Sequence, residues 1–99
     1  MKPLTYHPEA ESEIDSAHDW YLRQSLQAAD GFFEELIPAL NCIQDHPHLY
    51  SPYLLGTQRV VLSRYPFSIV FRELHHSIQI IAVAHAKRQP GYWAKRLKQ

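Results

Sequence analysis

Cysteine is almost absent from this sequence, and glycine and methionine are scarce. The single Cys42 excludes a disulfide within the chain, and it supplies too few thiolates for a structural zinc site. No apolar stretch approaches the roughly 18 residues of a membrane span, and residues 1–15 turn acidic where a secretory signal would be apolar. These absences predict a cytoplasmic protein without metal, cofactor or membrane anchor, held together by its hydrophobic core.

Basic residues are rare in the first half of the chain, and acidic residues are rare in the second. Residues 1–50 contain two basic and nine acidic residues, whereas residues 51–99 contain eight and one, so the net charge of zero is the sum of −7 and +7. The local electrostatic potential guides association with charged partners. We therefore expect the functional surface in the second half of the chain, where it would face a polyanionic or acidic partner. With 99 residues, 45% of them hydrophobic, the chain is predicted to form one domain over residues 1–99.

Two amphipathic helices are predicted in the acidic half. Pro8 suits the first turn of a helix, where a missing N–H costs little, and acidic residues follow it in the positive end of the helix dipole. Apolar residues then recur at spacings of three and four and form one stripe directed to the core: Ala10, Ile14, Ala17 and Tyr21. Three carboxylates fall on another face and are expected to be solvated: Glu11, Asp15 and Asp19.

The second helix is predicted over residues 27–44. Pro38 removes one backbone hydrogen bond, so we expect a local kink rather than two separate helices. The helix is predicted to end before Pro47, because the residue preceding a proline disfavours helical backbone. The aromatic side chains of the two helices are expected to pack between them and onto a sheet: Trp20, Tyr21, Phe32 and Phe33.

Strands are predicted in the basic half, at residues 59–62, 67–72 and 77–84, where β-branched and aromatic residues accumulate. The connectors between them are too short for a crossover helix, so these strands should pair as an antiparallel meander. With a short opening strand at residues 4–6, the predicted fold class is α+β in the order β-α-α-β-β-β. The two helices would pack on one face of a small antiparallel sheet, leaving the other face partly open to a partner or to solvent.

Four segments, in their order and spacing, point to a family. They are Pro8-Glu9-Ala10, Asp19-Trp20-Tyr21, RYPFSIVFRE at residues 64–73 and AVAHAKRQPGYW at residues 82–93. Together they resemble the RelE/ParE toxin superfamily over nearly the whole chain. The resemblance implies the toxin of a type II toxin-antitoxin or plasmid stabilisation module, inhibiting growth unless a cognate antitoxin holds it inactive. It also implies the same β-α-α-β-β-β fold.

The superfamily contains two activities, ribosome-dependent mRNA cleavage in the RelE branch and inhibition of DNA gyrase in the ParE branch. The positions that match the nuclease residues of the RelE branch are Arg59, Val61, Ser68, Lys87 and Trp93. Serine lacks the fixed positive charge that stabilises a phosphorane, and tryptophan has no ionisable hydroxyl for acid-base chemistry. The resemblance is therefore closer to the ParE branch, which acts by binding DNA gyrase and has no catalytic residue of its own.

The candidate residues for binding the target or the antitoxin are basic or aromatic: Arg59, Arg64, His85, Lys87, Arg88, Tyr92 and Trp93. Cations interleaved with exposed aromatic rings are typical of binding sites, although the same cations could serve only the solubility of the sheet edge and tail. Further cations follow in the tail: Lys95, Arg96 and Lys98. Two close histidine pairs, His46 with His48 and His75 with His76, lack a metal-ligand pattern nearby, so no metal site is predicted.

Two other functions remain open at the level of sequence. The chain could be an mRNA endonuclease that works with the ribosome and uses His85, Arg64 and Lys87 in place of the usual set. His85 ends a hydrophobic strand beside two cations, where a general acid or base would be useful, although a strand-end histidine also serves as a structural hydrogen-bonding group. The third possibility is an inactive toxin that retains only its antitoxin as a partner.

Overall fold

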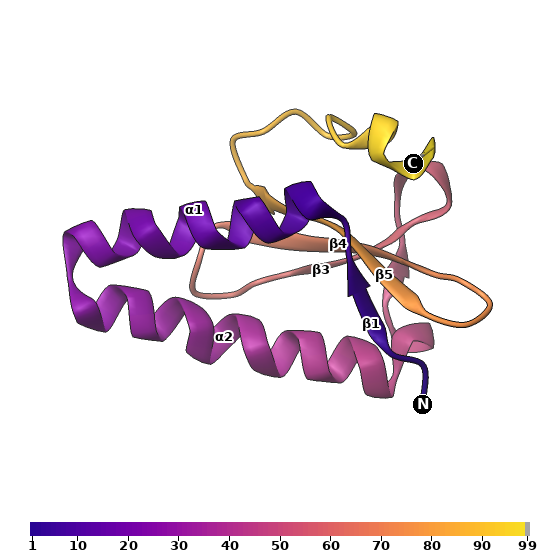
Figure 1. The fold of residues 1–99 in the computed structure, drawn as a ribbon, viewed down its shortest axis with the longest axis horizontal. Helices are drawn as coiled ribbons and strands as arrows, with labels where there is room; N and C mark the ends of the chain where they lie inside the picture. Colours follow the sequence, from indigo (N-terminus) through magenta and orange to yellow (C-terminus); the bar gives the residue numbers. More distant parts are fainter. Residues whose placement is uncertain (99) are drawn as a thin grey trace.

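The computed structural model describes residues 1–98, in which two antiparallel helices lie on one face of a five-stranded sheet (Figure 1). The helices are α1 (Pro8–Gln24) and α2 (Leu26–Asp45). The strands are β1 (Leu4–Tyr6), β2 (Ser51–Pro52), β3 (Gln58–Val61), β4 (Phe67–Glu73) and β5 (Ile78–His85). Short 3₁₀ helices occupy Pro47–Leu49, Leu54–Gly56 and Ala94–Lys98. The predicted order of elements and the α+β class are confirmed, with β2 as an additional short strand.

Both helices begin with a side chain that caps them. The Nδ1 atom of His7 accepts the backbone N–H of Glu9 at 3.1 Å, and Pro8 occupies the first turn of α1 as predicted. Ser25 ends α1 and begins α2, accepting the Ala28 N–H at 3.0 Å through its hydroxyl. This shared residue turns the chain back on itself, so α2 lies against α1. α2 runs as one helix through Pro38.

The sheet order is β1-β5-β4-β3-β2, with β2 to β5 antiparallel and β1 parallel to β5. The predicted antiparallel meander of β3, β4 and β5 is confirmed. The sheet is mixed and not wholly antiparallel as expected, because the two helices carry the chain from β1 across to the opposite edge before it returns to β5, which allows parallel pairing. β1 is only three residues long, so β5 extends past it with one edge free of strand partners.

The face of the sheet toward the helices holds the main core. Its largest fully buried members include Phe32, Leu36 and Ile43 from α2, with Phe71 and Ile80 from the sheet. The predicted stripe of α1 contributes to this core, and the carboxylates expected to be solvated are exposed. Trp20 is an exception among the helix aromatics, because 52% of it is exposed. No helix within residues 1–98 is long and apolar enough to span a membrane.

The opposite face, which we expected to stay partly open, is covered in part by the C-terminal segment. After β5 the chain crosses this face and ends in the 3₁₀ helix Ala94–Lys98, drawn in yellow in Figure 1. Trp93 packs there against Val70, Ile81 and Ala82 in a second buried cluster. The protein therefore has a core on each side of its sheet, and the last residues of the chain build the smaller one.

Candidate functional site

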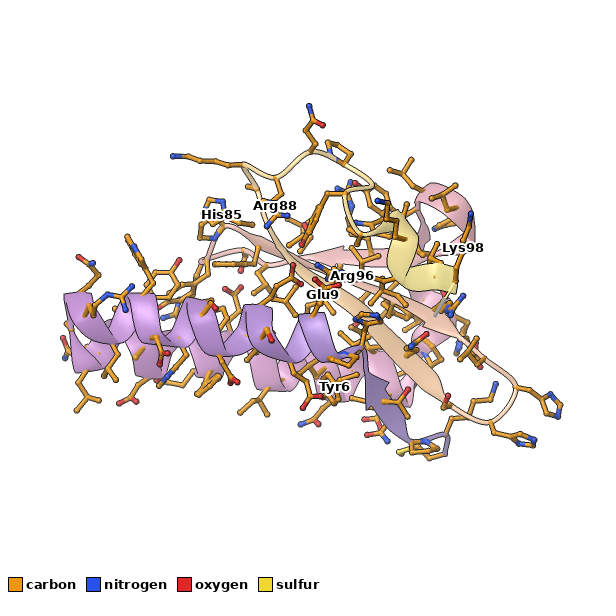
Figure 2. The ribbon with its side chains drawn as sticks, turned by 45° about the horizontal axis from the view of Figure 1, so that its top comes forward. Tyr6, Glu9, His85, Arg88, Arg96 and Lys98 are labelled. Carbon is orange, nitrogen blue, oxygen red and sulfur yellow. The ribbon has the colours of Figure 1, made fainter. Side chains whose placement is uncertain are left out.

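Five of the seven candidate residues line a cleft of about 90 Å³ on the face of the sheet away from the helices, Trp93 among them although it is buried. Arg59 reaches it from β3, His85 from the end of β5, and Arg88 and Tyr92 from the segment that follows. Figure 2 shows His85 and Arg88 side by side above the sheet. Lys87 lies exposed between them in the sequence and does not line the cleft. The folded chain thus assembles a basic rim from two distant parts of the sequence.

Each of the two cleft arginines lies over the ring of a tyrosine. The guanidinium carbon of Arg88 is 3.9 Å from the centre of the Tyr92 ring, and that of Arg59 is 4.1 Å from the centre of the Tyr53 ring. Cation–π contact of this kind restricts the side chain while leaving its N–H groups available to a partner. Within residues 1–98, neither arginine forms a salt bridge. The pairs therefore present fixed, uncompensated positive charge.

The ring of His85 is held in a defined orientation. Its Nδ1 atom accepts the backbone N–H of Lys87 at 3.0 Å, and its ring stands edge-on to Phe67 with 5.1 Å between centroids. An Nδ1 atom that accepts a hydrogen bond is unprotonated, so in the neutral ring the proton is on Nε2. His85 then offers a donor rather than a base to an incoming group.

Arg64 lies apart from the other candidates. It occupies the turn between β3 and β4 and lines neither of the two clefts that include His85. A Cβ added to Gly31 of α2 would lie 3.2 Å from a terminal nitrogen of Arg64 and 2.3 Å from the hydroxyl oxygen of Tyr65, so this glycine makes room for the turn. The clefts of about 90 and 470 Å³ both include His85 but neither Arg64 nor Lys87, so neither cleft gathers the trio required by the endonuclease hypothesis.

A second cleft, of about 470 Å³, lies between α1, the end of β5 and the C-terminal segment. At its inner end, Arg96 donates to both carboxylate oxygens of Glu13, each at 2.9 Å, and also to the carbonyl oxygen of Ile81 at 3.0 Å. The Tyr92 hydroxyl donates to the same carboxylate at 2.5 Å. Figure 2 shows Arg96 beside Glu9, where α1 meets the C-terminal segment; its Nε atom is 3.6 Å from the Glu9 carboxylate.

Burial and the adjacent Glu13 carboxylate both raise the pKa of Tyr92 well above its usual value. The phenol therefore stays protonated and acts as a hydrogen-bond donor over the whole physiological range. Burial lowers the pKa of Arg96, but the Glu13 carboxylate more than compensates, so the pKa is raised and the guanidinium stays charged.

Residues 4–90 match the family model described as the ParE toxin of the type II toxin-antitoxin system, parDE. The chain belongs to the ParE toxin family. A solved structure titled as the chromosomal ParDE TA system from P. aeruginosa contains a similar chain, with a TM-score of 0.76 and 21% identity. The alignment covers 88% of this chain and 98% of that one, which establishes the ParE fold. No curated protein matches the chain.

Two expectations about the tail of this ParE-family chain are wrong. Trp93 was expected to be exposed beside the cations, but only 1% of it is accessible, because it fills the second core. Arg96 was expected to belong to the basic surface, but it is 7% exposed and neutralised by Glu13. The exposed cations of the tail are Lys95 and Lys98. Burial thus removes one aromatic residue and one cation from the predicted ParE surface.

Sequence reasoning missed Glu13 and Tyr53. Glu13 stands three residues after Ala10 and four before Ala17, on the stripe that α1 directs to the core. A carboxylate on a buried stripe needs a partner, and this signal was present in the sequence. Tyr53 carried no comparable signal, because only the folded sheet of the ParE domain brings it under Arg59. Among residues 1–98, no three His, Cys, Asp or Glu side chains form a metal-binding group.

The turn that carries Arg64 is fixed by one carboxylate of α2. Glu35 accepts the backbone N–H groups of Ser63, Arg64 and Tyr65 at 2.6 to 3.1 Å, and the Ser63 hydroxyl at 2.8 Å. Burial raises the pKa of the Glu35 carboxyl, but these hydrogen bonds, first that of the Ser63 hydroxyl, outweigh it and lower the pKa below its usual value.

We expect Glu35→Gln to destabilise the ParE fold by about 1 kcal/mol at pH 7, because hydrogen bonds to a charged acceptor are replaced by weaker ones. A carboxyl with a lowered folded-state pKa contributes stability above its unfolded pKa, about 4.3, and loses it as the pH falls through the lower folded pKa. The difference between wild type and variant in urea denaturation should therefore shrink below about pH 4. Glu34→Gln, at the preceding exposed position, should change neither the free energy of unfolding nor its pH dependence. A destabilisation by Glu35→Gln that is independent of pH would contradict the lowered pKa of the Glu35 carboxyl.

Proposed function

We propose that this chain is the toxin of a type II toxin-antitoxin module, that it inhibits growth in the cytoplasm by binding DNA gyrase, and that a cognate antitoxin neutralises it. The observation that carries the proposal is the rim of the smaller cleft. There, Arg59 and Arg88 are stacked on tyrosine rings and form no salt bridge within residues 1–98, and Lys87 is exposed beside them. Arginine stacked on an aromatic ring is a frequent anchor of protein interfaces. Membership of the ParE family makes DNA gyrase the expected target.

Binding is favoured over mRNA cleavage by two features of the site. The Nδ1 lone pair of His85 is engaged by the Lys87 backbone, and Arg64 lines neither cleft that His85 lines. A general base needs a free lone pair within reach of the proton it removes, and a phosphorane needs fixed cations around it. The site thus supplies cations for a partner surface, and the Nδ1 lone pair that His85 would need as a base is occupied.

The double variant Lys87→Ala, Arg88→Ala should lose inhibition of gyrase supercoiling by about 30-fold or more, because truncating interface anchors typically costs at least about 2 kcal/mol. Its melting temperature should match that of the wild type, since both residues are exposed. Lys95→Ala, Lys98→Ala removes the same charge from the exposed cations of the last 3₁₀ helix and serves as the matched control. It should remain within about twofold of the wild type.

Three other results would each contradict this proposal. Equal potency of the two double variants would place the gyrase contact elsewhere on the protein. If the purified protein leaves gyrase untouched but cleaves translated mRNA in primer extension, and His85→Ala loses about 100-fold of that rate, the endonuclease function holds. If the protein is inert in both assays and still binds its antitoxin, it is an inactive toxin.

The antitoxin segment that covers the basic rim is expected to be acidic, because the uncompensated charge of Arg59, Lys87 and Arg88 needs a counter-charge. The dissociation constant of the complex should rise about tenfold between low and high salt, as exposed ion pairs are screened. Isothermal titration at two ionic strengths measures it. An affinity independent of salt, or a basic toxin-binding segment in the antitoxin, would contradict the electrostatic part of the proposal.

A further inference from the structure

One carboxylate connects three parts of the protein that meet only in the folded state. Glu13 of α1 accepts the backbone N–H of Val83 at 3.0 Å, on the part of β5 that extends past β1. The same carboxylate accepts the Tyr92 hydroxyl and both terminal nitrogens of Arg96. It therefore satisfies a backbone N–H group at the edge of the sheet and holds the C-terminal segment at two points. Glu13 is largely buried, with 17% of its side chain exposed.

The two contacts to the C-terminal segment have different consequences. Trp93 already anchors this segment in the second core, and Arg96 adds the ion pair and a bond to the Ile81 carbonyl. The bond from the Tyr92 hydroxyl is not needed to keep the segment attached. Its effect is to fix the plane and position of a ring that stands over the end of β5.

The ring of Tyr92 in turn supports Arg88, whose guanidinium carbon lies 3.9 Å from the ring centre. Arg88 is exposed and forms no salt bridge within residues 1–98, and its own backbone is held by a single hydrogen bond of a turn, from its N–H to the His85 carbonyl. The Tyr92 ring is thus the main constraint on where this cation points. A chain of contacts runs from Glu13 through Tyr92 to Arg88.

We propose that Glu13 is a positioning residue for the partner-binding surface: by holding the Tyr92 hydroxyl, it fixes the ring that places the Arg88 guanidinium at the rim of the cleft. This inference rests on the proposed function, in which Arg88 contacts the target. Glu13 itself is engaged by Val83, Tyr92 and Arg96 and acts through the Tyr92 ring. Fixing the cation before binding lowers the conformational cost of association, so loss of the constraint weakens binding.

A double-mutant cycle tests the connection. Tyr92→Phe removes this hydrogen bond and keeps the ring and the ion pair of Glu13 with Arg96. Glu13→Gln replaces the charged acceptor of the same hydrogen bond by a neutral amide and also removes that ion pair. Potency in gyrase supercoiling assays should fall several-fold in each single variant. The double variant should be little worse than Glu13→Gln alone, because that change already weakens the hydrogen bond that Tyr92→Phe removes. Glu11→Gln, an exposed carboxylate two residues earlier, is the matched control and should keep full potency.

A readout that does not involve the target separates this inference from the proposed function. In the free protein, the Tyr92 ring shifts the NMR resonances of the Arg88 side chain; these shifts should decrease in Glu13→Gln and in Tyr92→Phe, and persist in Glu11→Gln. Unchanged Arg88 shifts in Tyr92→Phe, or multiplicative losses of potency in the double variant, would overturn the inference. If Glu13→Gln does not fold, Tyr92→Phe alone decides it. A wild type without effect on gyrase refutes the proposed function and leaves the NMR test intact.

Discussion

Trp93→Ala should destabilise the protein by about 3–5 kcal/mol, the usual cost of truncating a large aromatic side chain in a core. Only 1% of Trp93 is exposed, and it is the largest fully buried side chain, packed against Val70, Ile81 and Ala82. The smaller core has few other members, so little can move in to fill the space. Since domains of this size are stable by about 5–15 kcal/mol in total, much of the variant is expected to be unfolded at 37 °C.

The chain offers its own control for this experiment. Trp20, its other tryptophan, is 52% exposed on α1, and Trp20→Ala should cost much less than Trp93→Ala in urea denaturation. In each variant the remaining tryptophan reports unfolding by fluorescence. Equal destabilisation by the two substitutions would mean that Trp93 does not fill a core in solution.

Arg96→Ala should cost about 3–5 kcal/mol, because it leaves the carboxylate of Glu13 largely buried without its counter-charge. The Arg96 side chain is 8% exposed and makes two hydrogen bonds to that carboxylate, both at 2.9 Å. Removing one partner of such a pair is far more costly than removing an exposed charge. The loss should appear in urea denaturation at pH 7.

Lys95→Ala is the matched control for Arg96, since it removes an exposed cation from the preceding position of the same 3₁₀ helix. Its free energy of unfolding should stay within about 0.5 kcal/mol of the wild type. A similarly small effect of Arg96→Ala would show that Tyr92 and solvent can satisfy Glu13 by themselves. The C-terminal segment would then be held by Trp93 and by the hydrogen bond from Tyr92 to Glu13.

Elements whose pattern is local could be predicted from the sequence. The stripe that includes Ala10 and Ala17 repeats within one helix, and the short connectors of the meander restrict β3, β4 and β5 to antiparallel pairing. The position of the candidate residues His85 and Arg88 could be predicted because they stand at the end of a recognisable strand and just after it. β2 was not predicted, because a pairing of Ser51 and Pro52 with β3 has no periodic signal.

The exposure predicted for the tail was wrong because the burial of its residues depends on partners that are distant in the sequence. Trp93 and Arg96 stand in a run of cations, and in sequence this run is indistinguishable from a solvated tail. Their burial depends on an uncovered sheet face and on Glu13, which is separated from Arg96 by 83 positions. Composition and spacing contain no information about a pairing of that range.

Contacts between distant parts of the sequence also set the order in which the protein can acquire its structure during synthesis. Leu4 and Tyr6 of β1 pair with Ile78 and Ile80 of β5, so β1 has no partner strand until β5 has been made. A chain emerging from the ribosome has its two helices early, but their apolar stripes have no complete sheet to cover until β5 is made. Contacts between sequence-distant segments form slowly because a long loop must close first. The basic rim around Arg88 therefore exists only once β5 and the segment that follows it have been made, so the helical half of the chain is without this surface until then.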